Sequence, residues 1–168
     1  STIEIPQTVA NIGAAAFAGC TKLDSVAIPV SVTAIGDSAF SGCTSLTSIG
    51  IPTSITAIGA NTFSGCVKLD SVAIPASVTE IGGNAFSGCA SLSTIDIPSS
   101  VTQIGDGAFA FCSSLETVQI GEMDSVKNTQ KSKTIEVLGS DDVTVGARAF
   151  YGCEGLKSVF IPRSVTFI

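Results

Sequence analysis

Cysteine is the first residue type in this sequence whose number and spacing could support chemistry. The chain has six cysteines and no histidine. The first five cysteines recur at one constant spacing, and the full set is Cys20, Cys43, Cys66, Cys89, Cys112 and Cys153. An even number of cysteines could form three disulfides or bind a metal ion. A tetrahedral metal site needs four ligands that converge on one point, whereas equivalent positions of a repeated unit place their side chains in a single column.

The same column argues against disulfides. Parallel side chains in neighbouring units have the wrong relative direction for the dihedral angle that a disulfide requires. The sequence therefore predicts buried free thiols that pack as small apolar groups. We expect neither a metal ion nor another cofactor.

The carboxylates give no stronger indication of catalysis. Asp24, Asp70 and Glu116 lie two repeat lengths apart, and Thr47 and Ser93 occupy the positions between them. This alternation keeps like charges from stacking about 5 Å apart, so a folding requirement explains it. The chain has no histidine to act as general base for a nucleophile, and no phosphate-binding glycine motif opens a helix. We therefore expect that the chain is not an enzyme.

Composition excludes other classes of partner. Of the 168 residues, 45% are hydrophobic and only 13% are charged, which is about half the usual share of charged residues. The net charge of −6 disfavours nucleic acid, because binding to phosphates depends on lysine and arginine. No apolar run approaches the roughly 20 residues that span a bilayer, and no signal peptide begins at Ser1. We expect no nucleic-acid partner and no direct insertion into a membrane.

A 23-residue repeat provides the elements that position these residues. Phenylalanine recurs with the same spacing as cysteine, at Phe17, Phe40, Phe63, Phe86 and Phe109. One unit reads L-x-x-[VI]-x-I-P-x-x-[VI]-T-x-I-G-x-x-x-F-x-G-C-x-x. Internal repeats of this length are typical of solenoids.

Each unit contains the pattern of a short strand followed by a corner. In "LDSVAIP", Val26 and Ile28 alternate with small polar or exposed residues, which predicts a strand with one buried face. Pro29 ends this strand because proline has no N–H group to donate. In "SVTAIG", Val32 and Ile35 point inward and form a second short strand.

The remainder of the unit, "DSAFSGCTS", is too short for a regular helix. We expect one helical or 3₁₀ turn that places Phe40 and Cys43 in the interior. A single unit has nothing above or below its apolar side chains. Stacked units bury them when the strands pair in parallel at about 4.8 Å, so the array is expected to be stable although one coil is not.

The Ile-Pro, Ser-Val-Thr, Ile-Gly and Ala-Phe-x-Gly-Cys sequences recur together at fixed offsets, and in this respect the chain resembles the BspA-like class of leucine-rich repeats. The resemblance implies one leucine-rich repeat domain over residues 1–168, with about seven coils of which the first and last are incomplete. It implies a right-handed solenoid with a parallel β-sheet on the concave face, and with short second strands and single helical or 3₁₀ turns on the convex side.

The same resemblance implies a function and a location. Proteins of this class are found on microbial cell surfaces or are secreted, and they bind host, matrix or other cell-surface proteins. The expected function is therefore that of a protein-binding module, in an extracellular or cell-surface adhesin. The alternative is a structural spacer or stalk that presents another domain and has no ligand of its own.

Residues 121–142 interrupt the repeat. Gly121 stands where the pattern calls for proline, and Phe150 follows Phe109 by nearly two repeat lengths. The polar segment predicts an irregular insertion. We interpret it as a hairpin-like excursion, with a degenerate short coil as the alternative. The insertion could bind a partner through its basic side chains, which are Lys127, Lys131 and Lys133. The preferred interpretation is a tolerated insertion without function.

Large and charged residues at outward strand positions are concentrated in the C-terminal coils. Binding energy is usually concentrated in such residues, whereas the N-terminal coils carry Ala27, Gly50 and Ala73 at the equivalent positions. The predicted protein-binding residues are Asp96, Glu116, Thr117, Gln119, Lys157, Ser158, Phe160 and Tyr151. An alternative for the phenylalanine is packing against the strand of a further coil.

Neither end of the sequence carries the polar cap of a terminal repeat. The sequence therefore predicts a piece of a longer array. It also predicts that exposed terminal strands could pair head to tail between copies of the chain.

Overall fold

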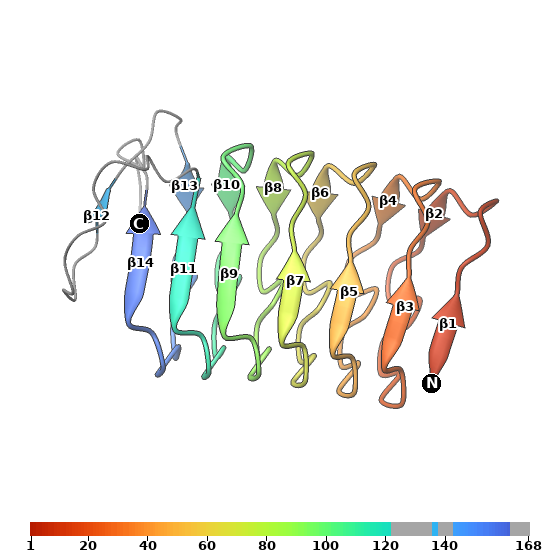
Figure 1. Cartoon of the computed structure of the whole chain (residues 1–168), viewed down its shortest axis with the longest axis horizontal. Coiled ribbons are helices and arrows are strands. Elements are labelled where there is room, and N and C mark those ends of the chain that lie inside the picture. The colour runs from red at the N-terminus through yellow and green to blue at the C-terminus, as the bar shows by residue number, and fades with distance from the viewer. Residues whose placement is uncertain (122–135, 138–142, 162–168) are drawn as a thin grey trace.

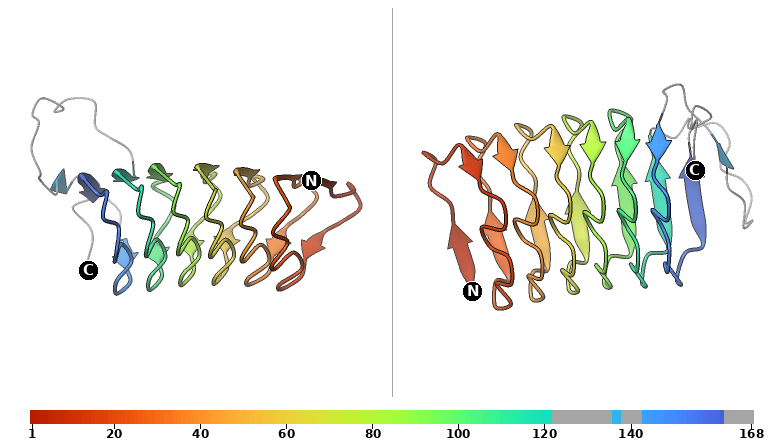
Figure 2. Two further views of the ribbon diagram at one scale, coloured as in Figure 1. Left: turned by 90° about the horizontal axis from the view of Figure 1, so that it is seen from below. Right: turned by 180° about the vertical axis from the view of Figure 1, so that it is seen from behind.

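Repeating coils stack along one axis in the computed structural model of the chain (Figure 1). The structure describes residues 1–121, 136–137 and 143–161. Each full coil contributes one longer strand and one short strand, and these form two rows along the stack (Figure 2). Turns and extended segments connect the two rows.

The longer strands pair in parallel, each with the equivalent strand of the next coil. In β3, Val26 lies opposite Ile3 of the preceding coil and Ile49 of the following one, a shift of one repeat. The first sheet has the order β1-β3-β5-β7, and the second has the order β9-β11-β14-β12. The strands are β1 (Thr2–Glu4), β3 (Ser25–Ala27), β5 (Ser48–Gly50), β7 (Ser71–Ala73), β9 (Thr94–Ile97), β11 (Thr117–Ile120), β12 (Glu136–Val137) and β14 (Ser158–Ile161).

The short strands also pair in parallel, in the orders β2-β4 and β6-β8-β10-β13. Each has one exposed and one buried residue, as the sequence predicts for Ala34 and Ile35. They are β2 (Asn11–Ile12), β4 (Ala34–Ile35), β6 (Ala57–Ile58), β8 (Glu80–Ile81), β10 (Gln103–Ile104) and β13 (Thr144–Val145). The predicted parallel solenoid is therefore confirmed.

The segment between the short strand and the next longer strand differs from the prediction. The sequence predicts a helical or 3₁₀ turn here, but the described coils have a series of hydrogen-bonded turns and no helix. The Cys43 amide donates to the Phe40 carbonyl within the coil (3.2 Å), whereas the Phe40 amide donates to Thr62 of the next coil (2.9 Å). Ser38 and Gly42 adopt the left-handed conformation, with φ of 59° and 70°. Bonds within the coil and bonds to the next coil therefore alternate along this segment, and every second amide donates to the neighbouring coil.

Phenylalanine rings form a continuous stack through the core. Neighbouring ring centroids lie 5.2–5.6 Å apart, and the interplanar angles are between 2° and 20°. The stack consists of Phe17, Phe40, Phe63, Phe86, Phe109 and Phe150. The inner four rings are fully buried. The column that the constant spacing predicts is confirmed, and it continues across the longer gap before Phe150.

The insertion does not pair the strands on either side of it with each other. β11 lies between β9 and β14, whereas β12 pairs in parallel with the other edge of β14. In the expected hairpin, β11 and β12 would be antiparallel neighbours. Most of the insertion, with Lys127, Lys131 and Lys133, lies outside the described residues.

Truncation of an inner ring is expected to cost much more stability than truncation of Phe17. Phe63→Ala removes a fully buried ring that stacks on both sides, and it should lower the free energy of unfolding by about 3–5 kcal/mol. Phe17 is only partly buried and, among the described residues, stacks on Phe40 alone, so Phe17→Ala should cost clearly less. Urea denaturation followed by circular dichroism measures both values. Equal losses of unfolding free energy in the two variants would contradict the view that the continuous ring stack is the main stabilising feature of the core.

Candidate protein-binding face

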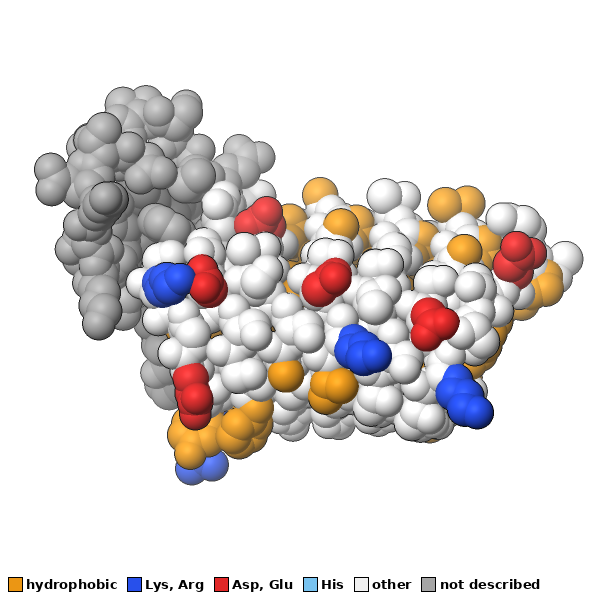
Figure 3. Space-filling model, turned by 60° about the horizontal axis from the view of Figure 1, so that its bottom comes forward, with side chains coloured by type: hydrophobic (Ala, Val, Ile, Leu, Met, Phe, Trp, Pro, Cys, Tyr) orange, Lys and Arg blue, Asp and Glu red, His pale blue; other side chains and the backbone are white. Residues whose placement is uncertain are grey.

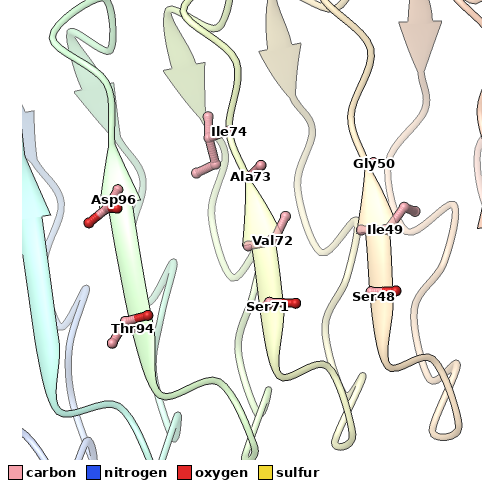
Figure 4. Close-up of a pocket in the computed structure, with 9 residues that line it drawn as sticks. All are labelled: Ser48, Ile49, Gly50, Ser71, Val72, Ala73, Ile74, Thr94 and Asp96. Carbon is pink, nitrogen blue, oxygen red and sulfur yellow. The ribbon is translucent and has the colours of Figure 1, made fainter.

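An open depression lies on the row of longer strands. It spans β5, β7 and β9 and has a volume of about 510 Å³ (Figure 4). Its lining consists of Ser48, Ile49, Gly50, Ser71, Val72, Ala73, Ile74, Thr94 and Asp96. The lining combines three branched aliphatic side chains and two small residues with three hydroxyl groups and one carboxylate.

The depression lies where the row of longer strands is divided into two sheets. No hydrogen-bonded ladder joins β7 to β9, although ladders join the strands on either side. Val72 of β7 is partly exposed, whereas Val26 and Ile49 at the equivalent position are 5% exposed. Gly50 and Ala73 contribute little side-chain volume above this opening. The surface is therefore hollowed between two sheets that are otherwise continuous.

Next to the depression, three neighbouring strands bring together six of the predicted binding residues. The strand register places Thr117 beside Thr94 and Ser158, and it places Gln119 beside Asp96. The members of this group, which we call the strand face, are Asp96, Glu116, Thr117, Gln119, Lys157 and Ser158. The register thus places these residues side by side in β9, β11, β14 and the residues that precede them, and their role in binding stays a prediction.

The strand face carries an excess of negative charge. Glu116 Oε1 and Lys157 Nζ form an ion pair at 2.7 Å, and both side chains are more than half exposed. Asp96 is also exposed, and no described basic side chain pairs with it. The paired charges cancel, so the carboxylate of Asp96 remains. Figure 3 shows acidic side chains scattered among uncharged ones on this side of the molecule, one of them next to a basic side chain.

The backbone of Phe160 belongs to β14 and lies opposite Gln119. Its side chain is outside the described part of the structure, so its predicted contact role stays a prediction. Tyr151 differs from the other predicted residues because it lies in the turns that precede β14, and not on a longer strand.

Tyr151 contacts a residue that the sequence analysis did not single out. Its ring lies 5.4 Å from that of Phe111, at an interplanar angle of 87°. Phe111 has a φ of 60°, at a position where earlier coils have glycine. A bulky residue in this conformation costs about 1–2 kcal/mol. The sequence carries the signal, because "FAFC" replaces "FSGC" of the preceding coil.

All six cysteines are free thiols, as predicted, and four of them are fully buried. Each thiol from Cys43 onward donates a hydrogen bond to the phenylalanine carbonyl of the preceding coil, for example Cys66 Sγ to Phe40 at 3.2 Å. The same carbonyl also accepts the amide of Cys43 at 3.2 Å. In the described residues, no cluster of three or more cysteine or acidic side chains could hold a metal ion. The thiols therefore link neighbouring coils.

The fold is that of a leucine-rich repeat solenoid. A family model for the BspA-type leucine-rich repeat region matches residues 1–116, 39–137 and 127–168, with six copies. The chain belongs to this family. No curated protein sequence matched the chain.

Solved structures with this fold come from several bacteria. A leucine-rich repeat protein of T. pallidum has a TM-score of 0.81 and 30% identity, over 99% of this chain and 72% of that one. A leucine-rich cell-surface protein of Faecalibacterium prausnitzii has a TM-score of 0.70 and 40% identity, over 74% of this chain and 32% of that one. A leucine-rich repeat protein of Bacteroides ovatus has a TM-score of 0.64 and 28% identity, over 98% of this chain and 46% of that one. The chain thus spans about a third of the second protein and under half of the third.

The described part of the chain has no helix with the length and hydropathy of a membrane span.

The thiol column predicts a loss of stability at alkaline pH. Burial, together with the charge of a neighbouring thiol, raises the pKa of Cys66 and Cys112 from 9.0 to about 12, and burial raises the pKa of Cys89 as well. Below pH 9 these thiols are protonated in both the folded and the unfolded chain, so they do not lower the free energy of unfolding. Between pH 9 and 12 only the unfolded chain releases their protons. The free energy of unfolding should therefore fall by up to about 1.4 kcal/mol per pH unit for each thiol.

Urea denaturation between pH 8 and pH 11 measures this slope. The variant Cys66→Ala lacks one of the titrating groups, so its free energy of unfolding should fall less steeply with pH than that of the wild type. The difference in slope isolates the contribution of this thiol, because all other groups are the same in the two proteins. Identical slopes for the two proteins would show that the Cys66 thiol does not ionise on unfolding in this range.

Proposed function

We propose that this chain is a protein-binding module of a secreted or cell-surface adhesin, and that it binds its partner through the strand face. The observation that supports this most directly is the grouping of six large, charged or hydroxyl-bearing side chains on three adjacent strands and the residues that precede them. The outward positions of β3, β5 and β7 carry only serine, alanine and glycine, although Asp24 and Asp70 precede β3 and β7 at the position of Glu116. Contact energy in protein interfaces is concentrated in large residues.

The charge of the strand face indicates the chemistry of the partner. Asp96 is unpaired among the described residues, and Glu116 is exposed enough to exchange Lys157 for a basic group of another protein. Complementary charge guides association and determines specificity. The proposed partner is therefore a host matrix or cell-surface protein that presents lysine or arginine. No reaction is assigned to the strand face, since leucine-rich repeats generally serve as scaffolds.

The small residues of the N-terminal coils favour one alternative function. Ala27, Gly50 and Ala73 form a column with little to bind. A chain with such a surface throughout would act as a spacer that presents another domain. In that case substitutions on the strand face would have no effect on any interaction.

Neutral substitutions on the strand face are expected to weaken partner binding and to leave stability almost unchanged. Asp96→Asn combined with Glu116→Gln should raise the Kd for a bound matrix protein at least tenfold, and the remaining binding should depend less on salt. An exposed ion pair contributes about 0–1 kcal/mol to stability, so the unfolding midpoint should hardly change. A biosensor assay with purified extracellular-matrix proteins, presented one at a time, measures the affinity.

Glu80→Gln is the matched control, because Glu80 is an exposed acid in β8, in the row of short strands. This variant should bind with wild-type affinity. Equal weakening by the control and by the strand-face variant would place the interaction elsewhere. Absence of binding to every matrix and cell-surface protein tested would favour the spacer.

A further inference from the structure

Phe111 and Tyr151 form an exposed aromatic pair on the turns, apart from the longer strands that carry the strand face. The two side chains are 57% and 59% exposed. Val30 and Val67, the other large hydrophobic residues exposed in the described coils, belong to earlier coils. Figure 3 shows a compact hydrophobic group at one end of the lower edge, with an acidic and a basic side chain beside it.

The backbone at Phe111 is unusual for such a residue. Glycine occupies this position in the other coils that the structure describes, with φ between 70° and 74°. Phe111 keeps the same left-handed conformation with a φ of 60°, although a bulky side chain disfavours it. Strain of this kind persists where the surrounding structure holds it in place, and it is concentrated at functional sites. An exposed ring gains little from burial to offset the strain. The stability of the fold alone therefore does not explain why phenylalanine stands at this position.

The surrounding structure fixes both rings. The Phe111 amide donates to the Tyr151 carbonyl at 2.7 Å. The Phe111 ring lies across Gly152, where a Cβ atom would come within 2.8 Å of Cδ1. The rings meet at 87° with centroids 5.4 Å apart. They therefore present a right-angled corner to solvent that is already ordered before a ligand binds.

We propose that this aromatic corner, defined by Phe111 and Tyr151, is a docking site for an extended, proline-containing segment of a protein. Proline-rich segments bind between aromatic side chains, and their restricted backbone loses little entropy on binding. A pyrrolidine ring can lie against the face of one aromatic ring and the edge of the other. The proposal depends on the proposed function only because its ligand is a protein; it uses different residues from the strand face.

The charges beside the corner favour a polypeptide over other ligands. Arg148 and Glu154 flank Tyr151 in the sequence, both are exposed, and neither forms an ion pair with another described residue. Opposite charges on the two sides match a polypeptide, which carries both signs. A polyanion would face the net charge of −6.

Tyrosine fluorescence provides a direct test, because Tyr151 is the only tyrosine and the chain has no tryptophan. A blocked decaproline peptide titrated into the intact chain should change the fluorescence in a saturable manner. The variant Phe111→Gly restores the residue of the other coils, so it should unfold at the same or a higher urea concentration than the wild type. The same variant should bind decaproline at least tenfold more weakly.

Val67→Ser is the matched control, since it removes another exposed hydrophobic side chain and should bind decaproline like the wild type. Asp96→Asn with Glu116→Gln should also retain decaproline binding, and Phe111→Gly should retain strand-face binding to a matrix protein. These two results separate the failure of this proposal from that of the proposed function.

Three outcomes would overturn the proposal. One is a decaproline titration without a saturable change in the wild type. Another is a Phe111→Gly variant that is less stable than the wild type yet binds the peptide equally well, which would assign the aromatic pair a packing role. The third is a saturable response to cellohexaose and none to decaproline, which would indicate a glycan site.

Discussion

The structure depends on the stacking of equivalent side chains in neighbouring coils. Each coil contributes one phenylalanine, one cysteine and several aliphatic residues, and each finds the same residue above and below it. The backbone follows the same rule, because alternate amides in the turns donate to the next coil. No coil has a core of its own. Cooperation between neighbours therefore provides both the apolar burial and the satisfied hydrogen bonds that stabilise the chain.

The columns could be predicted from the sequence because a strictly constant repeat length leaves a single register for stacking. Val26, Phe40 and Cys43 are buried as expected, and the thiols are free. The prediction of a helical turn around Phe40 was wrong, and the reason is physical. Short segments rich in small residues suit a helical turn, and their sequence does not show that every second amide bonds to another coil. The pairing partner of β12 was equally hidden, since it depends on where the chain returns after the insertion.

The candidate sites could likewise be predicted only in part. Asp96 and Gln119 could be found because they replace alanine or glycine of earlier coils at outward positions, and the register then brings them beside the other residues of the strand face. The depression between β7 and β9 could not be predicted, because Ser71–Ala73 reads like the strands before it. Phe111 was not among the predicted residues. Its replacement of a glycine was visible in the repeat, but its exposure and its contact with Tyr151 required the structure.

The repetitive core leaves the surface free to vary. Side chains that point outward from the strands or turns do not take part in the buried columns, so they can differ between coils at small cost to folding. This explains how one chain combines coils with small, featureless surfaces and coils with charged or aromatic ones.

The stack of rings continues from Phe109 to Phe150 with a centroid distance of 5.6 Å and an interplanar angle of 6°, although the two rings are nearly two repeat lengths apart in the sequence. β10 and β13 pair in the ordinary register across the same gap. The seam between Gly121 and Val143 therefore accepts chain of another length while the coils on both sides keep their places. For protein engineering, this seam is a natural position for grafting a foreign peptide onto the scaffold.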